Sequence, residues 1–265
     1  MAAWYRKPIA GVLFDISGVL FESGASNAIV GSVDAIKRIK ESGMPVRFCT
    51  NETQKTRMNL VEKLVKLGFD VAEGEVFPPA PAMCHILRQR NLRPHLLVHP
   101  NNAPDFAGID TKNPNCVVLG DATDFYTYEN LNKAFQVLVS QDKPLLFAMG
   151  AGRFYKENDK LCLDVGPFMK ALEFACDVKA EIVGKPSAAF FNTALADMGL
   201  PAEKVMMVGD DIVSDVGGAQ ACGMRGVQVR TGKFRPQDEN HPTVKADGYV
   251  DNLAAAVDLI LKHRS

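Results

Sequence analysis

The chain has 265 residues, of which 47% are hydrophobic and 23% are charged, and its formal net charge at pH 7 is −1. At about 150 residues per domain, this predicts a globular protein of one or two domains. The balanced charge, with no basic run, argues against a nucleic-acid partner, and no apolar run reaches the ~18–20 residues of a membrane span.

The cysteines are scattered and mostly lie inside apolar segments, at positions 49, 84, 116, 162, 176 and 222. Without a CxxC pair or a Cys/His cluster, this pattern favours free buried thiols over a zinc site or disulfides. The first ten residues, MAAWYRKPIA, have mixed charge and lack the apolar segment of a signal peptide. These features predict a protein of the reducing cytoplasm.

The first 67 residues alternate between strand-like and helix-like patterns, which predicts a βαβα unit. The expected elements are a strand at GVLFDI (11–16), a helix over 31–42, a strand at MPVRFCTN (44–51) and a helix over 53–67. Ser32 is the expected N-cap of the first helix. Both strands end in polar side chains, Asp15 in the first and Thr50 with Asn51 in the second. Because ligands bind at the carboxyl ends of parallel strands, we expect these residues to meet.

The segment FPPAPA (77–82) contains three prolines. Proline is excluded from the interior of helices and central strands, so we expect a stiff connector and a domain boundary here. A second α/β set follows, with strands at HLLVHP (95–100), CVVLGDA (116–122) and PLLFAMG (144–150) and helices near 128–140 and 167–177. The chain then crosses back near 177–184.

The last third returns to the first pattern. Its expected elements are a helix at 185–199, a strand at KVMMVGDD (204–211), a helix near 213–222, a strand at MRGVQVR (224–230) and a helix at 251–264. Alternating strands and helices predict an α/β fold with parallel sheets. Residues 1–82 and 179–265 then form a core domain, and residues 83–178 form an inserted domain.

Polar side chains follow four of the expected strand ends in the core. They are Asp15, Thr50 with Asn51, Lys185, and Asp210 with Asp211 and Asp215. Singly, each has an ordinary structural explanation as a turn former, a helix cap or a solvated lysine. Together, in this order at the ends of parallel strands, they favour an active site.

These segments resemble a known family. DISG (15–18), the polar pair in FCTNE, the lysine of GKP and GDDIVSD resemble, in order, the four motifs of the haloacid dehalogenase-like hydrolases. The resemblance runs from about residue 9 to 262, and the insertion resembles the C2-type α/β cap of that family. It implies a Rossmann-like parallel-sheet core with a smaller inserted cap, and a magnesium-dependent phosphatase that forms an aspartyl-phosphate.

The chemistry of the residues agrees with this implication. An aspartate with a pKa near 3.9 is ionised at pH 7, so Asp15 needs no base to act as a nucleophile. Phosphate is also anionic, and two like charges about 4 Å apart repel by ~4 kcal/mol at an effective dielectric constant near 20. Mg²⁺, which prefers oxygen ligands, can be held by Asp15 and Asp210. Lys185 supplies a second cation.

The resemblance implies the remaining site residues. The backbone carbonyl of Ser17 would be a third metal ligand, and the substrate would be bound by Asp15, Ile16, Ser17, Thr50, Asn51 and Lys185. The hydroxyl of Thr50 and the amide of Asn51 would donate to the phosphoryl oxygens, while Gly18 would let the backbone turn tightly. Asp211 and Asp215 are weaker candidates, one for orienting the metal site and one for loop or cap structure.

Ser17 departs from the family pattern, which is DxDG. The missing aspartate normally protonates the leaving oxygen, and general acid catalysis contributes about 10²–10⁴-fold. A nitrogen leaving group carries its own proton, and phosphate leaving from pyrophosphate is already stabilised. We therefore expect hydrolysis of phosphohistidine, phospholysine, imidodiphosphate and pyrophosphate over alkyl esters, which is also the activity that the resemblance implies.

Two other functions remain open. One is a small-molecule phosphomonoester phosphatase with the same cap, and the other is a regulatory protein that only senses phosphate. A receiver domain uses similar residues but has about half this length and no cap. RTGKFRP (230–236) places three cationic side chains near a turn. We favour a turn at the protein surface over one that contacts the phosphate site.

The expected partners are small phosphorylated substrates, and phosphohistidine on folded proteins stays open because it would require an open cap. We expect neither nucleic acid nor membrane as a partner. The resemblance further implies a homodimer and a cytoplasmic location, with the nucleus as a second one.

Overall fold

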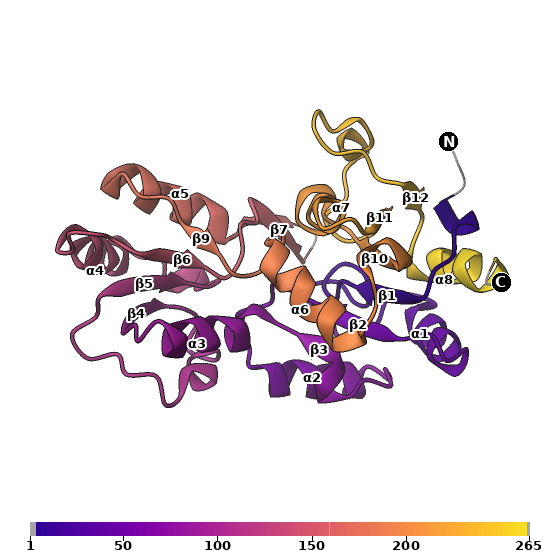
Figure 1. The fold of residues 1–265 in the computed structure, drawn as a ribbon, viewed down its shortest axis with the longest axis horizontal. Coiled ribbons are helices and arrows are strands. Elements are labelled where there is room, and N and C mark those ends of the chain that lie inside the picture. Colours follow the sequence, from indigo (N-terminus) through magenta and orange to yellow (C-terminus); the bar gives the residue numbers. More distant parts are fainter. Residues whose placement is uncertain (1–3, 159, 264–265) are drawn as a thin grey trace.

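The computed structural model describes residues 4–158 and 160–263. Residues 1–3, 159 and 264–265, which belong to the expected domains and to the end of the last expected helix, lie outside the described residues. Two parallel sheets dominate the fold and lie side by side, with the larger one on the right in Figure 1.

The larger sheet has six strands in the order β12-β11-β10-β1-β2-β3. All of its pairings are parallel. The strands are β1 Gly11–Phe14, β2 Val46–Cys49, β3 Val76–Phe77, β10 Val205–Gly209, β11 Arg225–Val229 and β12 Gly248–Val250. Strand β1 lies between β10 and β2, so it occupies the middle of the sheet.

Helices cover both faces of this sheet. They are α1 Ser32–Glu41, α2 Arg57–Lys66, α6 Ala188–Met198, α7 Gly218–Ala221 and α8 Leu253–Lys262. On one face, α1, α2 and α8 pack on Phe14 and Phe48. On the other face, α6 and α7 pack on Leu13 and Met207. Alternate side chains of β1 therefore pack into the two hydrophobic cores on opposite faces of the sheet, as expected for a strand buried on both faces.

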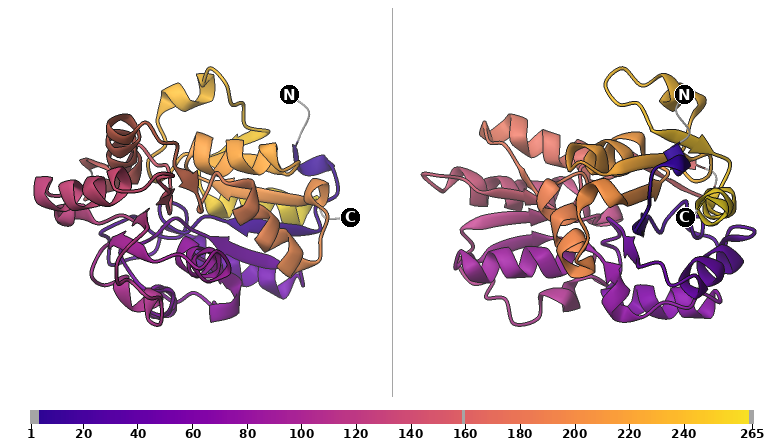
Figure 2. Two further views of the ribbon diagram at one scale, coloured as in Figure 1. Left: turned by 60° about the vertical axis from the view of Figure 1, so that its left-hand side comes forward. Right: turned by 45° about the vertical axis from the view of Figure 1, so that its right-hand side comes forward.

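The smaller sheet has four parallel strands in the order β4-β5-β6-β9. Its elements are β4 Pro94–Leu97, β5 Cys116–Leu119, β6 Leu146–Ala148, β9 Glu181–Ile182, α3 Pro79–Gln89, α4 Tyr128–Val139 and α5 Val165–Cys176. Helix α3 covers one face, and α4 with α5 covers the other (Figure 2). The predicted fold class, a parallel-sheet core with a smaller α/β insertion, is confirmed.

An antiparallel pair was not anticipated from the sequence. Strands β7 Phe154–Glu157 and β8 Lys160–Leu163 form a separate two-stranded sheet. The remaining short elements are a π-helical segment, Ile212–Gly217, and 3-10 helices at Trp4–Arg6, Glu73–Glu75, Ala103–Phe106, Thr123–Phe125, Ala202–Lys204 and Pro236–Asn240. Among the helices of the described chain, none has both the length and the apolar character needed to cross a bilayer.

Two local expectations were wrong. The prolines of 77–82 do not form a connector, because α3 begins at Pro79 and includes Pro81. The first turn of a helix has no intrahelical partner for its N–H groups, so proline is tolerated there. Ser32 is not the cap of α1, since Gly31 holds that position with φ 82°. The Ser32 hydroxyl instead lies within hydrogen-bond distance of two carbonyls, 2.6 Å from that of Ile29 and 3.0 Å from that of Leu20.

The packing bears on the domain boundaries expected at 82/83 and 178/179. Helix α3 contributes Met83 and Leu87 to the core of the smaller sheet, and β9 pairs with β6. We therefore propose that the inserted domain begins near residue 79 and ends near residue 184. It is then a few residues longer at each end than expected. We call this inserted domain the cap.

Candidate active site

A cavity of about 130 Å³ lies at the carboxyl edge of the six-stranded sheet. Core residues line its floor, among them Asp15, Lys185 and Asp210, and cap residues such as Asp121 and Tyr155 line it as well. The cavity therefore belongs to both domains, and it contains the residues that the sequence placed at strand ends.

The sheet itself brings the first of these residues together. Asp15 follows β1, and Asp210 follows the adjacent strand β10. Hydrogen bonds extend the strand pairing to the site, since the Asp15 N–H donates to the Val208 carbonyl over 2.9 Å. Thr50 follows β2 on the other side of β1, and its N–H donates to the Phe77 carbonyl over 3.2 Å. The backbone at the site is thus fixed by the centre of the sheet.

Lys185 lies buried beneath the cavity. Its Nζ donates to Asp15 Oδ1 over 2.6 Å, to Asp215 Oδ1 over 2.7 Å and to the Cys49 carbonyl over 2.9 Å. These three acceptors use all three donors of the ammonium group. Burial disfavours the charged form, but the two carboxylates outweigh it, so the pKa of Lys185 is raised.

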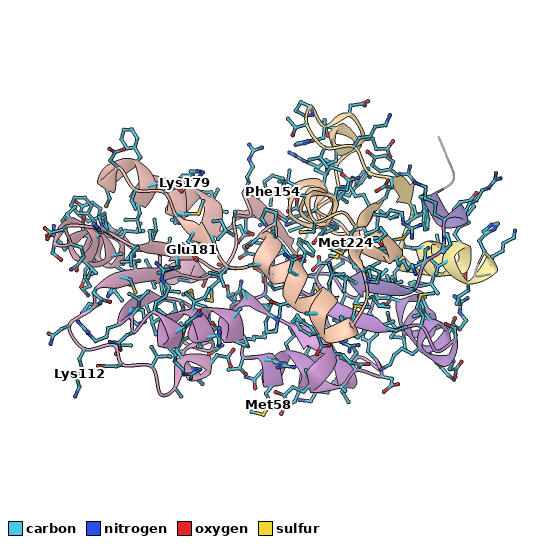
Figure 3. All side chains as sticks on the ribbon, viewed as in Figure 1. Met58, Lys112, Phe154, Lys179, Glu181 and Met224 are labelled. Carbon is cyan, nitrogen blue, oxygen red and sulfur yellow. The ribbon has the colours of Figure 1, made fainter. Side chains whose placement is uncertain are left out.

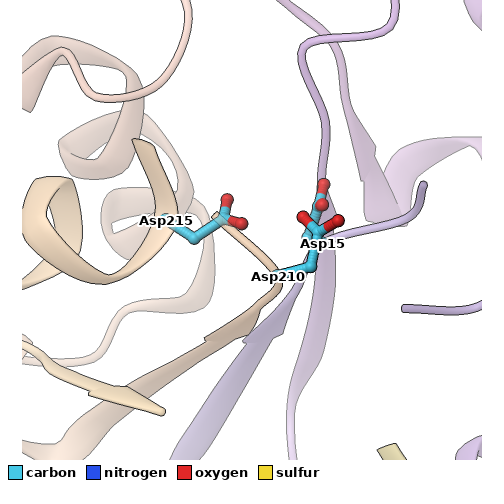
Figure 4. Close-up of side chains that lie close together, drawn as sticks. All are labelled: Asp15, Asp210 and Asp215. Atoms are coloured by element: carbon cyan, nitrogen blue, oxygen red, sulfur yellow. The ribbon is translucent and has the colours of Figure 1, made fainter. Parts of the chain in front are cut away.

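Asp15, Asp210 and Asp215 form a buried acidic cluster in which one oxygen of each lies within 4.8 Å of the others. Figure 4 shows the three carboxyl groups converging. Burial, together with the charges of Asp15 and Asp215, raises the pKa of Asp210 well above its usual value. Burial and the charge of Asp15 raise the pKa of Asp215 to about 6 despite the attraction of Lys185.

This cluster fits a divalent cation. The Oδ1 atom of Asp210 is buried and has no hydrogen-bond partner among the described residues. A buried carboxylate oxygen without a donor is costly unless a cation satisfies it. The donor set consists of oxygen atoms alone, which suits a hard ion such as Mg²⁺ better than a zinc-type ion.

Asn51 lines the cavity and also binds the backbone of Lys185. Its Nδ2 donates to the Lys185 carbonyl over 2.9 Å, and its Oδ1 accepts from the Lys185 N–H over 2.8 Å. Gly184 lies so close that a Cβ there would be 2.5 Å from the Asn51 Oδ1. The amide therefore fixes the backbone of the lysine, and its role as a phosphate ligand stays a prediction.

The other expected residues lie in the wall of the cavity or beneath it. Thr50 is buried and lines the cavity, and its Oγ1 accepts from the Glu52 N–H. Ser17 is half-buried and also lines the cavity. The Ile16 side chain is fully buried in the apolar core, so only its backbone could contact a substrate. Gly18 has φ +83°, and a Cβ there would lie 2.2 Å from Asp210 Oδ2.

Asp211 and Lys233 form a second charged pair beside the cluster. Asp211 Oδ1 accepts from the N–H groups of Val213 and Ser214, and its Oδ2 lies 2.9 Å from Lys233 Nζ. Burial opposes ionisation of Asp211, but Lys233 and these N–H donors lower its pKa. Asp211 therefore caps the segment that follows β10, whereas Asp215 belongs to the acidic cluster.

The cap closes over the cavity through β7 and the turn that follows it. The guanidinium of Arg235 stacks 4.7 Å above the Phe154 ring, which Figure 3 places between the two sheets. Gly24 of the core packs against Asn158 and Glu157, since a Cβ at Gly24 would lie 2.6 Å from Asn158 Oδ1. Sequence patterns had not revealed the strands β7 and β8, and none of their residues was assigned to the site.

Sequence comparisons identify the class of protein. Residues 12–108 match the model of the haloacid dehalogenase-like hydrolases, and residues 182–256 match a model described as HAD-hydrolase-like. The chain belongs to the haloacid dehalogenase-like hydrolase family. This confirms the resemblance based on the four motifs, and the chain is accordingly a hydrolase.

Among particular proteins, it is 61% identical over 267 residues to the phospholysine phosphohistidine inorganic pyrophosphate phosphatase of Bos taurus and 60% identical to that of Homo sapiens. Each alignment covers 99% of both chains. In structure, the chain is similar to a 4-nitrophenylphosphatase from Thermotoga maritima, with a TM-score of 0.84 and 26% identity over 95% of this chain and 97% of the other.

Proposed function

We propose that the protein is a Mg²⁺-dependent phosphatase that uses an aspartyl-phosphate on Asp15 to hydrolyse P–N bonds and pyrophosphate. The substrates are phosphohistidine, phospholysine, imidodiphosphate and inorganic pyrophosphate. The observation that carries the proposal is the Asp15–Lys185 pair, 2.6 Å apart, at the floor of a cavity shared with two further buried carboxylates. The names of the bovine and human relatives support the substrate class.

Asp15 can present one oxygen for attack. The hydrogen bond from Lys185 goes to Oδ1, and Oδ2 accepts none from the described side chains. Attack by a carboxylate oxygen forms the P–O bond to Asp15 and breaks the P–N or P–O bond to the leaving group. Water then cleaves the aspartyl-phosphate, which restores Asp15 and releases phosphate.

Lys185 holds the Asp15 carboxylate in place through their ion pair. The carboxylates of Asp15 and Asp210 would hold Mg²⁺ with the backbone carbonyl of Ser17. When bound, the ion supplies the positive charge that allows two anions to approach each other. Asn51 contributes by fixing the backbone of Lys185 through its two hydrogen bonds.

Ser17 directs the proposal to P–N and P–O–P substrates. A serine hydroxyl is too weak an acid to protonate a departing alkoxide, so the loss of this step should slow ester hydrolysis. The closed cap over a cavity of about 130 Å³ supports small substrates over folded phosphoproteins. One observation supports the second candidate, a phosphomonoester phosphatase with the same cap. It is the structural similarity to 4-nitrophenylphosphatases.

A phosphate-release panel with Mg²⁺ separates these candidates. We expect imidodiphosphate, phosphohistidine, phospholysine and pyrophosphate to be hydrolysed and phosphoserine or a sugar phosphate to be poor substrates. Equal rates on an alkyl ester would refute the assigned preference. No release from any compound, together with tight phosphate binding, would favour the phosphate-sensing alternative. Ser17→Asp should raise ester turnover if the missing carboxylate causes the preference.

We also propose a homodimer and a cytoplasmic location, with the nucleus as a second one. The cap exposes Tyr128 and Phe174 to 85% and 92%, which is compatible with a partner surface. Sedimentation of the purified protein tests the dimer, and a monomer at micromolar concentration would contradict it. Fluorescence microscopy of the tagged protein tests the location.

A further inference from the structure

The turn after β11, the neighbour of β10 in the sheet, reaches into the site. Three consecutive residues, Thr231, Gly232 and Lys233, each bind a different group of the site. The Thr231 hydroxyl donates to the Gly18 carbonyl, the Gly232 N–H donates to Glu22 Oε1 over 3.1 Å, and the Lys233 N–H donates to Asp210 Oδ2 over 2.8 Å. The turn therefore belongs to the site and is not a surface turn, contrary to the interpretation favoured from the sequence.

Glycine makes this close approach possible. Gly232 has φ +64°, and a Cβ there would lie 2.0 Å from Asp210 Oδ2 and 2.6 Å from the Gly18 Cα. No side chain fits between these atoms, so the two glycines, one on each loop, enclose the carboxylate of Asp210. The next residue, Lys233, is thereby held beside the acidic cluster.

The side chain of Lys233 faces the same cavity as Asp15 and Lys185. Its Nζ makes one ion pair within the described chain, to Asp211 Oδ2 at 2.9 Å, and the side chain is 19% exposed. An ammonium group has three donors, so Lys233 can still donate to a molecule in the cavity. Lys185 cannot do so in this geometry, because its three donors are already bound to protein oxygens.

The charges of the site support the same conclusion. Four carboxylates lie here, those of Asp15, Asp210, Asp211 and Asp215, against the ammonium groups of Lys185 and Lys233. Further carboxylates line the same cavity, among them Glu22 and Asp164. Carboxylates therefore outnumber ammonium groups around the cavity, and the positive charge of Lys233 lowers the repulsion that an incoming phosphoryl anion meets.

We propose that Lys233 is a phosphoryl-binding residue, a further cation of the site beside Lys185, supplied by the turn after β11 and held there by Gly232. The inference rests on the proposed function for the identity of the anion. It adds a residue that lies outside the four motifs and assigns the free donors of its ammonium to the phosphoryl oxygens.

The test measures binding of inorganic phosphate in the presence of Mg²⁺ by calorimetry, without turnover. We expect Lys233→Met to bind phosphate about tenfold or more weakly, as for the loss of a charge-assisted hydrogen bond. Lys233→Arg, which keeps the charge, should remain closer to the wild type. Lys112→Met is the matched control, because Lys112 is exposed in the cap at the edge of the molecule (Figure 3). It should bind phosphate as the wild type does.

Kinetics and stability separate binding from a structural role. In the substrate panel, Lys233→Met should raise KM more than it lowers kcat. Wild-type phosphate affinity in a folded Lys233→Met protein would overturn the inference, and Lys233→Gln would decide in the same way if the methionine variant fails to fold. A wild type that binds phosphate through Lys233 but hydrolyses nothing would refute the phosphatase function and keep this inference.

Discussion

Replacing Asp210 by Asn should stabilise the metal-free protein while abolishing its response to Mg²⁺. Asp210 is buried, its Oδ1 has no hydrogen-bond donor in the described structure, and burial together with the charges of Asp15 and Asp215 raises its pKa. An asparagine has nearly the same shape. Its oxygen can keep the hydrogen bond from the Lys233 N–H, and its NH₂ group can donate to the neighbouring carboxylates.

The geometry gives the size of the effect. Oxygens of the three carboxylates lie within 4.8 Å of one another. Two unit charges at that distance repel by about 3.5 kcal/mol at an effective dielectric constant near 20. Lys185 and Lys233 offset part of this, so we expect Asp210→Asn to raise the free energy of unfolding by about 1–2 kcal/mol without metal. Mg²⁺ at a hundred times its Kd should stabilise the wild type by about 2.7 kcal/mol and the variant by none.

The pH dependence has a definite sign. Because the folded pKa of Asp210 is raised, the folded state keeps a proton that the unfolded chain has lost. This difference lowers the free energy of unfolding. The loss is absent below about pH 4, where Asp210 is protonated in both states, and it grows as pH rises until the raised pKa is passed. The stability gain of Asp210→Asn should therefore be small near pH 4 and larger at neutral pH.

Urea denaturation with EDTA or with Mg²⁺, at several pH values, measures these quantities. Asp142→Asn is the matched control, because Asp142 is exposed and distant in sequence from the site. It should leave both the stability and the response to Mg²⁺ unchanged. A destabilised Asp210→Asn protein that still gains the wild-type increment from Mg²⁺ would refute the assignment of Asp210 as a metal ligand.

Three further substitutions test the floor of the site. Asp15→Asn should lower the rate of phosphate release by about 10⁴-fold or more, since it removes the nucleophile. Single-turnover assays measure this rate, and retained activity would mean that another residue is the nucleophile. Lys185→Met leaves Asp15 and Asp215 without their buried cation and should cost about 3–5 kcal/mol in denaturant unfolding; wild-type stability would contradict the ion pairs. Asn51→Ala removes two hydrogen bonds to the Lys185 backbone and should cost about 1–3 kcal/mol and lower kcat, whereas an effect confined to KM would indicate direct substrate binding.

The sequence was most informative where one physical rule decides the outcome. Parallel strands all end at the same edge of a sheet, so polar residues after apolar runs must gather there. Asp15, Lys185 and Asp210 do meet, with Lys185 Nζ 2.6 Å from Asp15 Oδ1. The catalytic roles assigned to them stay predictions, because proximity alone is not chemistry.

Partners across the site could not be predicted in the same way. The sequence identified Asn51 as polar and near the site, but its amide can bind either a phosphoryl oxygen or a backbone. In the structure it binds the Lys185 backbone, and the residue also lines the cavity. Lys233 was missed for a related reason, since a cationic turn resembles a surface turn unless the contact of Gly232 with the Asp210 carboxylate is known.

Weak patterns account for the remaining errors. The strands β7 and β8 are half-buried or exposed along most of their length, so their sequences lack the alternation that marks a strand. The prolines of α3 misled because a rule for helix interiors was applied to a helix start. In the first case the sequence carries no clear local pattern, and in the second the position of the prolines within the helix was unknown.

The position of the acidic cluster explains how the fold tolerates it. Three carboxylates this close would separate if their backbones could move. Asp15 and Asp210 instead follow β1 and β10, whose residues Val12–Phe14 and Val205–Val208 are fully buried and hydrogen-bonded to each other in parallel register. Moving either carboxylate would break the central pairing of the sheet and expose apolar side chains on both faces. The core therefore holds the carboxylates together, and a cation that binds between them relieves their repulsion without rearrangement of the site.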